Sequence, residues 1–110
     1  MEPLGDNRVA LGGRVLGAPR RRCSPAGIPI LQFVLEHASE QAEAGASRPV
    51  AVRIAVRASG ECAAAASGLG AGEPVRVLGY LARSRQGERL LLISARRIER
   101  LADTSELPGD

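Results

Sequence analysis

The side chains of this chain that are best suited to chemistry are its arginines. All 15 basic residues among the 110 are arginine, against 12 acidic residues, which leaves a net charge of +3. A guanidinium group is planar, stays charged, and binds a phosphate through two parallel hydrogen bonds. Two clusters are prominent, and their members are Arg20, Arg21, Arg22, Arg83, Arg85 and Arg89. A solvated surface or a GC-rich coding bias would also produce such clusters, so their place in the fold decides how they are interpreted.

Catalytic and metal-binding groups are sparse. His37 is the only histidine, and no serine or cysteine stands at a spacing that marks a nucleophile beside it. Cys23 and Cys62 are far apart and form no CxxC pair, which predicts free thiols and no zinc site or disulfide framework. The acidic residues are scattered, and Gly12-Gly13 belongs to no phosphate-binding loop. We therefore expect a binding protein that needs no cofactor or metal, and not an enzyme.

The segments that carry the arginines show the alternation of apolar and polar residues that is typical of half-buried strands. Strands are predicted at residues 8–16, 28–37, around 50–57, 73–82 and 90–98, with loops at 17–27, 38–47 and 83–89. The alanine-rich segment between Gly60 and Gly70 predicts a short helix that ends at a glycine. Gly12-Gly13 predicts a bulge or sharp bend in the first strand, and Pro29 should start the second strand or lie on an edge.

Three strands, a helix and two further strands predict an all-β fold, namely a five-stranded OB-fold barrel with one short helix between strands 3 and 4. We expect the OB-fold domain at residues 7–101, after a flexible N-terminus at 1–6 and before a flexible acidic C-terminal tail at 102–110. No apolar run is long enough for a spanning helix and no signal pattern is present, which predicts a cytoplasmic protein without membrane contact.

The predicted fold places the arginine clusters at its ligand-binding side. In OB folds the ligand face lies on strands 2 and 3, and the first–second and fourth–fifth loops embrace an oligonucleotide. These are the two loops that hold the clusters, and alternation in the third strand puts Arg53 and Arg57 on one outward face. The pattern favours a groove that binds a phosphate backbone without reading its sequence. Arg14 and Arg48 are weaker candidates for the same groove.

One long motif, SPAGIPILQFVLEHASEQAE at residues 24–43, carries a resemblance to a known family. With Asn7-Arg8-Val9, Gly13-Arg14-Val15, Glu43-Ala44-Gly45 and Arg48, it resembles the bacterial primosomal replication protein N (PriB) family and, more distantly, bacterial single-stranded DNA-binding protein. The resemblance covers nearly the whole chain, more loosely after residue 60. It implies a homodimer that binds single-stranded DNA and bridges the primosomal helicase PriA and a later-loading primosome protein. It also implies DNA contacts at Arg22, Arg83 and Arg85, with Arg89 nearby.

The chain departs from that family in its aromatic residues. The family has aromatic residues on the hairpin between strands 2 and 3 and on strand 3, where this chain has Ala46 and Ala51. Tyr80 is either a remaining exposed ring for stacking or a packing residue. We expect single-stranded DNA binding that is weaker than in aromatic-rich relatives and depends more on arginine. Leu16, Leu78 and Tyr80 are candidates for the dimer surface.

Three other functions fit parts of the pattern. The first alternative is a protein-interaction adaptor on the same OB fold, with weak or no DNA binding. A general single-stranded-DNA-coating protein fits less well, because the C-terminal segment lacks a long flexible extension with an acidic tip. An RNA-binding OB domain has the same barrel and charge, so these features do not distinguish between the two sugars.

Overall fold

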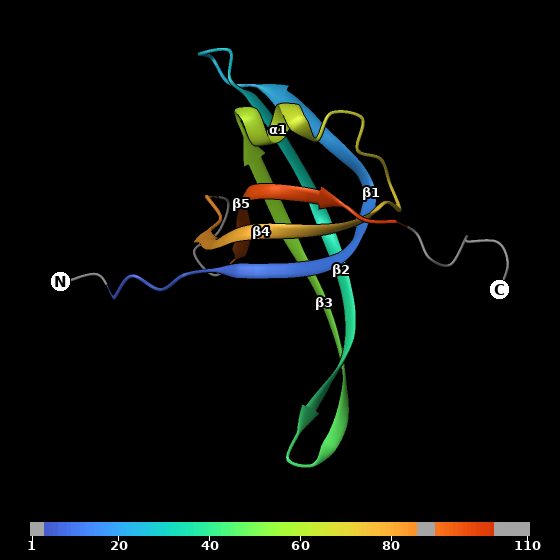
Figure 1. Ribbon diagram of the computed structural model, residues 1–110. Helices are drawn as coiled ribbons and strands as arrows, with labels where there is room; N and C mark the ends of the chain where they lie inside the picture. The colour runs from blue at the N-terminus through green and yellow to red at the C-terminus, as the bar shows by residue number, and fades with distance from the viewer. Residues whose placement is uncertain (1–3, 86–89, 103–110) are drawn as a thin grey trace, which may run out of the picture.

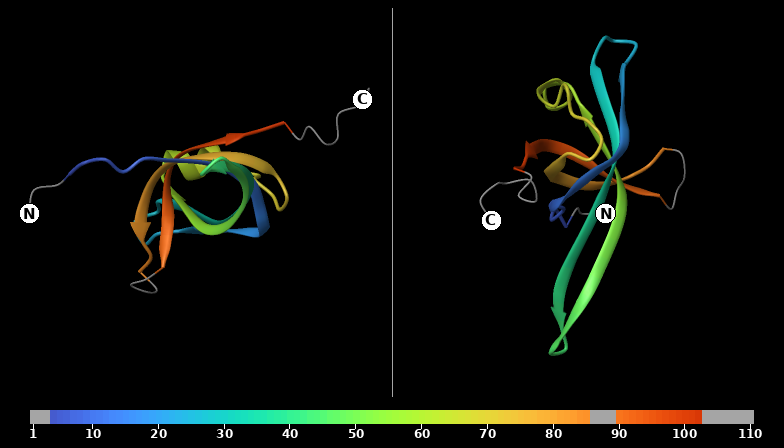
Figure 2. Two further views of the ribbon diagram at one scale, coloured as in Figure 1. Left: turned by 90° about the horizontal axis from the view of Figure 1, so that it is seen from below. Right: turned by 90° about the vertical axis from the view of Figure 1, so that its right-hand side faces the viewer.

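The computed structural model describes residues 4–85 and 90–102, and these residues fold into a barrel of strands with one short helix (Figure 1). The elements are β1 Val9–Cys23, β2 Pro29–Glu43, β3 Ala46–Ser59, α1 Glu61–Ala65, β4 Pro74–Arg83 and β5 Leu91–Arg100. The barrel closes in the order β1-β2-β3-β5-β4, with β3 and β5 parallel and every other pair antiparallel. The left view of Figure 2 looks into this ring. The predicted all-β barrel, with its helix between the third and fourth strands, is confirmed.

The core is built from the inward residues of the alternating strands. Leu31 and Leu35 of β2, Val75 and Val77 of β4, and Ile93 of β5 are fully buried. Each such side chain contributes roughly 1.5–3 kcal/mol through burial of its apolar surface. The helix α1 packs against β2, β3 and β5 and adds small residues to this core. Pro29 is the first residue of β2, as predicted.

Strand β1 is longer than the sequence predicts. Residues 17–23, predicted as a loop, continue the strand and pair with β2 as far as Cys23. The register breaks between Leu16 and Arg20, where Gly17 has a φ of 72°. Of the bulge or sharp bend predicted at Gly12-Gly13, the bulge is not found, because residues 9–14 pair with β4 in unbroken register, whereas a bend there agrees with the passage of β1 from β4 to β2 at Arg14. Extra residues at the true break interrupt the alternation, which made this part of the strand look irregular in the sequence.

Gly13 has a different role, which is to allow a close approach of two strands. It lies just before Arg14, the residue at which β1 changes its partner from β4 to β2. A Cβ atom at Gly13 would lie 2.9 Å from the carbonyl carbon of Glu36. Because that atom belongs to the backbone, it cannot move aside easily. Glycine therefore lets β1 pass close over β2 as the barrel closes.

The β2–β3 hairpin is also longer than predicted, and the loop expected at residues 38–47 is wrong. The strands continue to a two-residue turn at Ala44-Gly45, whose φ angles are 51° and 78°. Residues 40–49 are exposed, and this ribbon extends well beyond the barrel (Figure 1). The right view of Figure 2 shows the β1–β2 ribbon projecting at the opposite end and the β4–β5 hairpin projecting between them.

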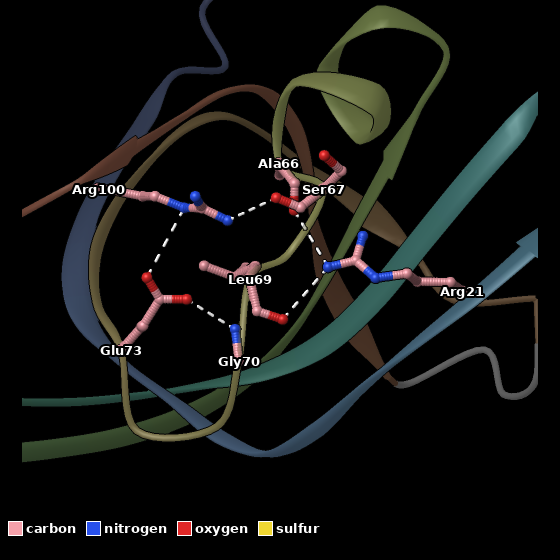
Figure 3. A network of polar contacts seen from close by, with 7 residues as sticks. All are labelled: Arg21, Ala66, Ser67, Leu69, Gly70, Glu73 and Arg100. Carbon is pink, nitrogen blue, oxygen red and sulfur yellow. Dashed lines mark hydrogen bonds and ion pairs between the residues drawn. The ribbon is translucent and has the colours of Figure 1, made fainter.

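The short helix α1 is held at its C-terminal end by an arginine of β1. The helix ends at Ala65 with Ala66 as its C-cap, so the predicted glycine cap is wrong. The Arg21 guanidinium donates hydrogen bonds to the carbonyl oxygens of Ala66, at 3.1 Å, and Leu69, at 3.2 Å (Figure 3). A positive charge is favourable at this end of a helix, where carbonyl groups lack helical partners.

A second arginine holds the same segment from the other side. Arg100 donates to the carbonyl oxygen of Ser67 at 2.8 Å and pairs with the Glu73 carboxylate at 3.7 Å (Figure 3). Glu73 in turn accepts a hydrogen bond from the backbone N–H of Gly70 at 2.6 Å. The connection from α1 to β4 is thus fixed by Arg21 of β1 and Arg100 of β5.

Candidate nucleic-acid interface

Three rows of paired residues cross the outer face of β1, β2 and β3. Residues directly opposite on antiparallel strands present their side chains on the same face of the sheet. The neighbours Val15, Leu35 and Val56 are buried in the core, so these rows face outward. The rows are Arg14–Glu36–Arg53, Leu16–Val34–Ala55 and Arg20–Gln32–Arg57. Four arginines therefore share one face, with an apolar row between them. We call Arg14, Arg20, Arg53 and Arg57 the arginine face.

The third strand confirms only part of its predicted alternation. Arg53 and Arg57 share the outward face, as expected, and Val56 lies in the core. Strict alternation also predicts Val52 on the inward side with Val56, but Val52 is exposed because it lies where the ribbon leaves the barrel. The Arg53 Nε atom is 2.9 Å from Glu36 Oε2, and the two side chains are 68% and 44% exposed. An ion pair this exposed adds at most about 1 kcal/mol to stability, so its main effect is to orient the Arg53 guanidinium.

The run of three arginines at positions 20–22 divides between different surroundings. Arg20 lies opposite Gln32 on the arginine face. Arg21 points to the other side and holds the end of α1, so it serves the fold and we leave it out of the proposed interface. Arg22 is exposed near the end of β1, beside a hollow that residues of α1 also line. The sequence treats the three as one cluster, whereas their strand positions give them separate roles.

The remaining predicted arginines lie on the projecting hairpins. Arg83 is the last residue of β4 and Arg85 follows it, and both are exposed. Arg89, predicted in the same loop, lies outside the described residues. Arg48 is exposed on the β2–β3 ribbon, opposite Gln41. Arg83 and Arg85 therefore lie at the β4–β5 hairpin and Arg48 on the long ribbon, outside the three rows of the arginine face.

Tyr80 continues one row of the arginine face around the barrel. Arg57 pairs with Ser94 of β5, and Ser94 pairs with Tyr80 of β4. Tyr80 is half-buried, and the guanidinium carbon of Arg96 lies 5.1 Å from the centre of its ring. This distance is within the range of a cation–π interaction. Sequence reasoning did not single out Arg96, because the contact depends on the β4–β5 register.

A hollow of about 480 Å³ opens where the long ribbon leaves the barrel. It is lined by Arg14, Glu36, His37, Ala38, Ala51, Val52 and Arg53. Arg14 is held on one side by a 3.0 Å hydrogen bond to the carbonyl oxygen of Gly72. Glu36 was not predicted as a site residue, although counting outward from the Ala44-Gly45 turn would have paired it with Arg53.

His37 fixes the base of the ribbon to β1. Its Nδ1 lies 2.6 Å from the Gly12 carbonyl oxygen, which only accepts, so Nδ1 carries the proton and donates. Its Nε2 lies 2.8 Å from Ser39 Oγ, and that oxygen also accepts a hydrogen bond from Gln41. Both ring nitrogens therefore have partners in the fold, which gives this lone histidine a structural role.

The cysteines and acidic residues form no second site within the described residues. Cys23 is exposed and Cys62 is half-buried, and both are free thiols. Burial raises the pKa of the Cys62 thiol above its ordinary value, because the thiolate loses hydration. No group of three His, Cys, Asp or Glu side chains is placed to hold a metal among residues 4–85 and 90–102. None of the described helices is long and apolar enough to cross a membrane.

The closed five-stranded barrel, with its helix between β3 and β4, defines the protein as an OB-fold protein. A family model described as "Another single-strand binding protein family" matches residues 7–97. Replication restart protein PriB of Erwinia tasmaniensis is 41% identical over 96 residues, which are 84% of this chain and 91% of that protein. PriB of Photorhabdus laumondii is 42% identical over the same shares. The chain belongs to the PriB family of single-strand binding proteins.

Solved structures agree with the fold. PriB of Ralstonia solanacearum superimposes with a TM-score of 0.77 at 24% identity, and the match covers 89% of this chain and 100% of that one. The single-stranded DNA binding protein of Thermus aquaticus, as a deletion mutant, gives 0.73 at 27% identity, over 88% of this chain and 51% of that one. The small single-stranded DNA-binding protein of Streptomyces coelicolor gives 0.70 at 23% identity, over 90% and 96%. The OB fold predicted from the sequence is shared with all three.

Proposed function

We propose that this protein binds single-stranded DNA on the arginine face and acts as an accessory protein of the replication-restart primosome. The DNA backbone crosses the outer side of β1, β2 and β3, and arginines of the projecting hairpins hold it at the margins. We include Arg22, Arg48, Arg83 and Arg85 in this contact set, and Tyr80 as a ring at its edge. Relatives about 40% identical are named replication restart protein PriB, which supports the cellular role.

The observation that supports this function most strongly is the row Arg20–Gln32–Arg57. Two guanidinium groups stand on β1 and β3, with the amide of β2 between them. A strand spacing of about 4.8 Å places the two arginines on the order of 10 Å apart across the face. The Leu16–Val34–Ala55 row offers apolar contact beside them, and exposed fractions of 38% and 37% leave Leu16 and Val34 accessible. Such a surface attracts phosphates without reading bases.

The proposal extends to assembly and location. The protein forms a homodimer in the cytoplasm, and the dimer presents bound DNA to the restart helicase PriA and a later-loading primosome protein. Leu78 of β4 marks the surface we propose for self-association, whereas Leu16 and Tyr80, the other candidates from the sequence, belong to the proposed DNA surface. Light scattering at micromolar concentration should give a mass twice the 11.5 kDa of one chain. A mass of one chain at that concentration would refute the dimer and leave DNA binding to be tested separately.

The DNA-binding proposal is tested by anisotropy of a labelled single-stranded oligonucleotide across a salt series. Each phosphate contact to a single strand contributes about −0.7 to the slope of log K against log salt. The double variants Arg20→Ala/Arg57→Ala and Arg83→Ala/Arg85→Ala should each flatten the slope by about 1.4. Arg97→Ala is the control, because this exposed arginine of β5 pairs with Leu78 of β4 and with the Glu99 carboxylate and not with residues of the arginine face. A control that flattens the slope as much as one arginine of these pairs would refute the proposed location.

A protein-interaction adaptor is the second candidate, favoured by the shortage of aromatic rings. The ribbon has Ala46 and Ala51 where aromatic residues would serve for stacking, and Arg96 already covers one side of Tyr80. If the folded protein fails to bind the oligonucleotide at low salt, the adaptor becomes the better account. The next measurement would then be capture of purified PriA by the immobilised protein.

A further inference from the structure

The hollow at the base of the β2–β3 ribbon has the size and lining of a small-molecule site. Its volume of about 480 Å³ falls within the roughly 300–1,000 Å³ of such pockets. Ala38 and Ala51 are directly paired across the ribbon, and their methyl groups leave the space open. The adjacent row contributes Arg53 and Glu36 as one wall. The hollow thus combines an apolar floor with a charged, hydrogen-bonding edge.

These features match a nucleobase better than a phosphate. A phosphate needs several donors converging on one point, whereas an apolar floor gives it no partner. A base has a flat apolar face and an edge of alternating donors and acceptors. Guanidinium planes stack on bases, and the Arg53–Glu36 pair supplies donors and acceptors together. The 2.9 Å ion pair holds the Arg53 guanidinium at the hollow, which lowers the entropy lost when a base binds.

We propose that this hollow is a nucleobase subsite, in which one base of the bound strand lies over Ala38 and Ala51 and stacks against the Arg53 guanidinium. This inference rests on the proposed binding of single-stranded DNA. It adds a contact to the base where the arginine face by itself would contact only phosphates. It also replaces the stacking that an aromatic side chain would provide, because the base occupies the space that the two alanines leave.

The test compares two strands that carry the same number of phosphates. One is a 20-nucleotide oligothymidylate, and the other is a 20-unit abasic strand with tetrahydrofuran in place of every nucleoside. Arg53→Lys keeps the charge but removes the planar group, so it should weaken binding of the thymidylate about 2- to 5-fold more than it weakens binding of the abasic strand. Arg97→Lys is a closely matched control. Its Nε is 3.1 Å from Glu99, it is 72% exposed, and it should change neither affinity.

A second variant fills the hollow without touching a charge. Ala38→Ile suits a strand and should weaken binding of the thymidylate while leaving the abasic strand unchanged. The emission of a 2-aminopurine base within an oligonucleotide, which neighbouring bases quench, should rise when the base leaves its stack for the hollow of the wild-type protein, and should rise less with Ala38→Ile. The chain has no tryptophan and one tyrosine, so its own emission interferes little. Circular dichroism spectra that match the wild type would exclude misfolding of either variant.

The outcomes separate this inference from the function on which it rests. If the wild-type protein binds the abasic strand as tightly as the thymidylate, DNA binding stands and the base subsite is refuted. The same conclusion follows if Arg53→Lys and Ala38→Ile bind the thymidylate like the wild type. If neither strand binds the folded wild-type protein at low salt, the proposed function itself fails.

Discussion

The arginine run at positions 20–22 provides a sharp test, because the structure gives adjacent identical residues opposite roles. Arg21 donates two hydrogen bonds to carbonyl oxygens at the end of α1, at 3.1 and 3.2 Å. Arg20 lies opposite Gln32 on the arginine face, and its side chain is exposed and outside the core. Replacing each by alanine removes the same charge and the same number of atoms. Only the position in the fold differs.

Arg21→Ala should reduce stability and leave the salt dependence of DNA binding unchanged. A hydrogen bond that involves a charged group is worth about 1.5–3 kcal/mol, and water replaces part of this at a half-exposed site, so we expect a net loss of about 1–3 kcal/mol. For a domain of this size, each kcal/mol lowers the melting temperature by about 4–8 °C. Arg20→Ala should leave the melting temperature unchanged and flatten the salt slope by about 0.7.

Both properties can be measured on the same samples, by circular dichroism melts and by oligonucleotide anisotropy across a salt series. Our reasoning would be refuted by the reverse pattern, in which Arg21→Ala flattens the slope at an unchanged melting temperature. Equal destabilisation by the two variants would also refute it, because the structure then would not distinguish the two side chains.

Three further expectations concern the barrel, the ribbon and the thiols. Gly13→Ala should destabilise the protein by about 1–3 kcal/mol, because the added Cβ meets the Glu36 backbone. Gly12→Ala is the control and should be neutral, because the nearest atom to its Cβ is 3.8 Å away. Equal melting temperatures for the two variants would contradict the close approach of the strands. Ala44→Asn should raise the stability of the protein by up to about 1 kcal/mol, because asparagine adopts a positive φ more easily than alanine and Asn-Gly is a favoured two-residue turn. A lower melting temperature would contradict the turn. With Ellman's reagent at pH 8, the exposed Cys23 should react quickly and Cys62 slowly, because the raised pKa of Cys62 leaves less thiolate. Cys62→Ser should therefore remove only the slow phase of the reaction. Loss of the fast phase in this variant would contradict the assignment.

The barrel was predictable because its core strands alternate and its order of elements is distinctive. The two ribbons were not, for a physical reason. Alternation reports a buried face, and residues 40–49 have no buried face because both sides of the ribbon meet solvent. The segment therefore looked like a loop, although Ala44-Gly45 contains the glycine of a tight turn. Similarly, residues 17–27 were predicted as a loop, whereas β1 in fact absorbs extra residues after Leu16 and continues to Cys23.

The candidate site was predictable in composition and not in arrangement. The outward pair Arg53 and Arg57 followed from simple alternation in β3. The separation of Arg20 from Arg21 could not be predicted, because it depends on the register after the break in β1. The Arg53–Glu36 pair and the Tyr80–Arg96 contact also depend on register. The position of the turn determines which residues pair across a hairpin. If the turn is predicted at the wrong residues, every cross-strand pair along the ribbon is predicted wrongly.

The central claim is that single-stranded DNA lies on the arginine face. The most direct test is to follow the amide chemical shifts of the isotope-labelled protein while an oligothymidylate is added. We expect the largest shifts at Arg20, Gln32 and Arg57 and at the base of the ribbon. Leu78 and Arg97, paired on the β4–β5 side of the barrel, should change little. Shifts concentrated at Leu78 and Arg97, with the arginine face unchanged, would contradict the account.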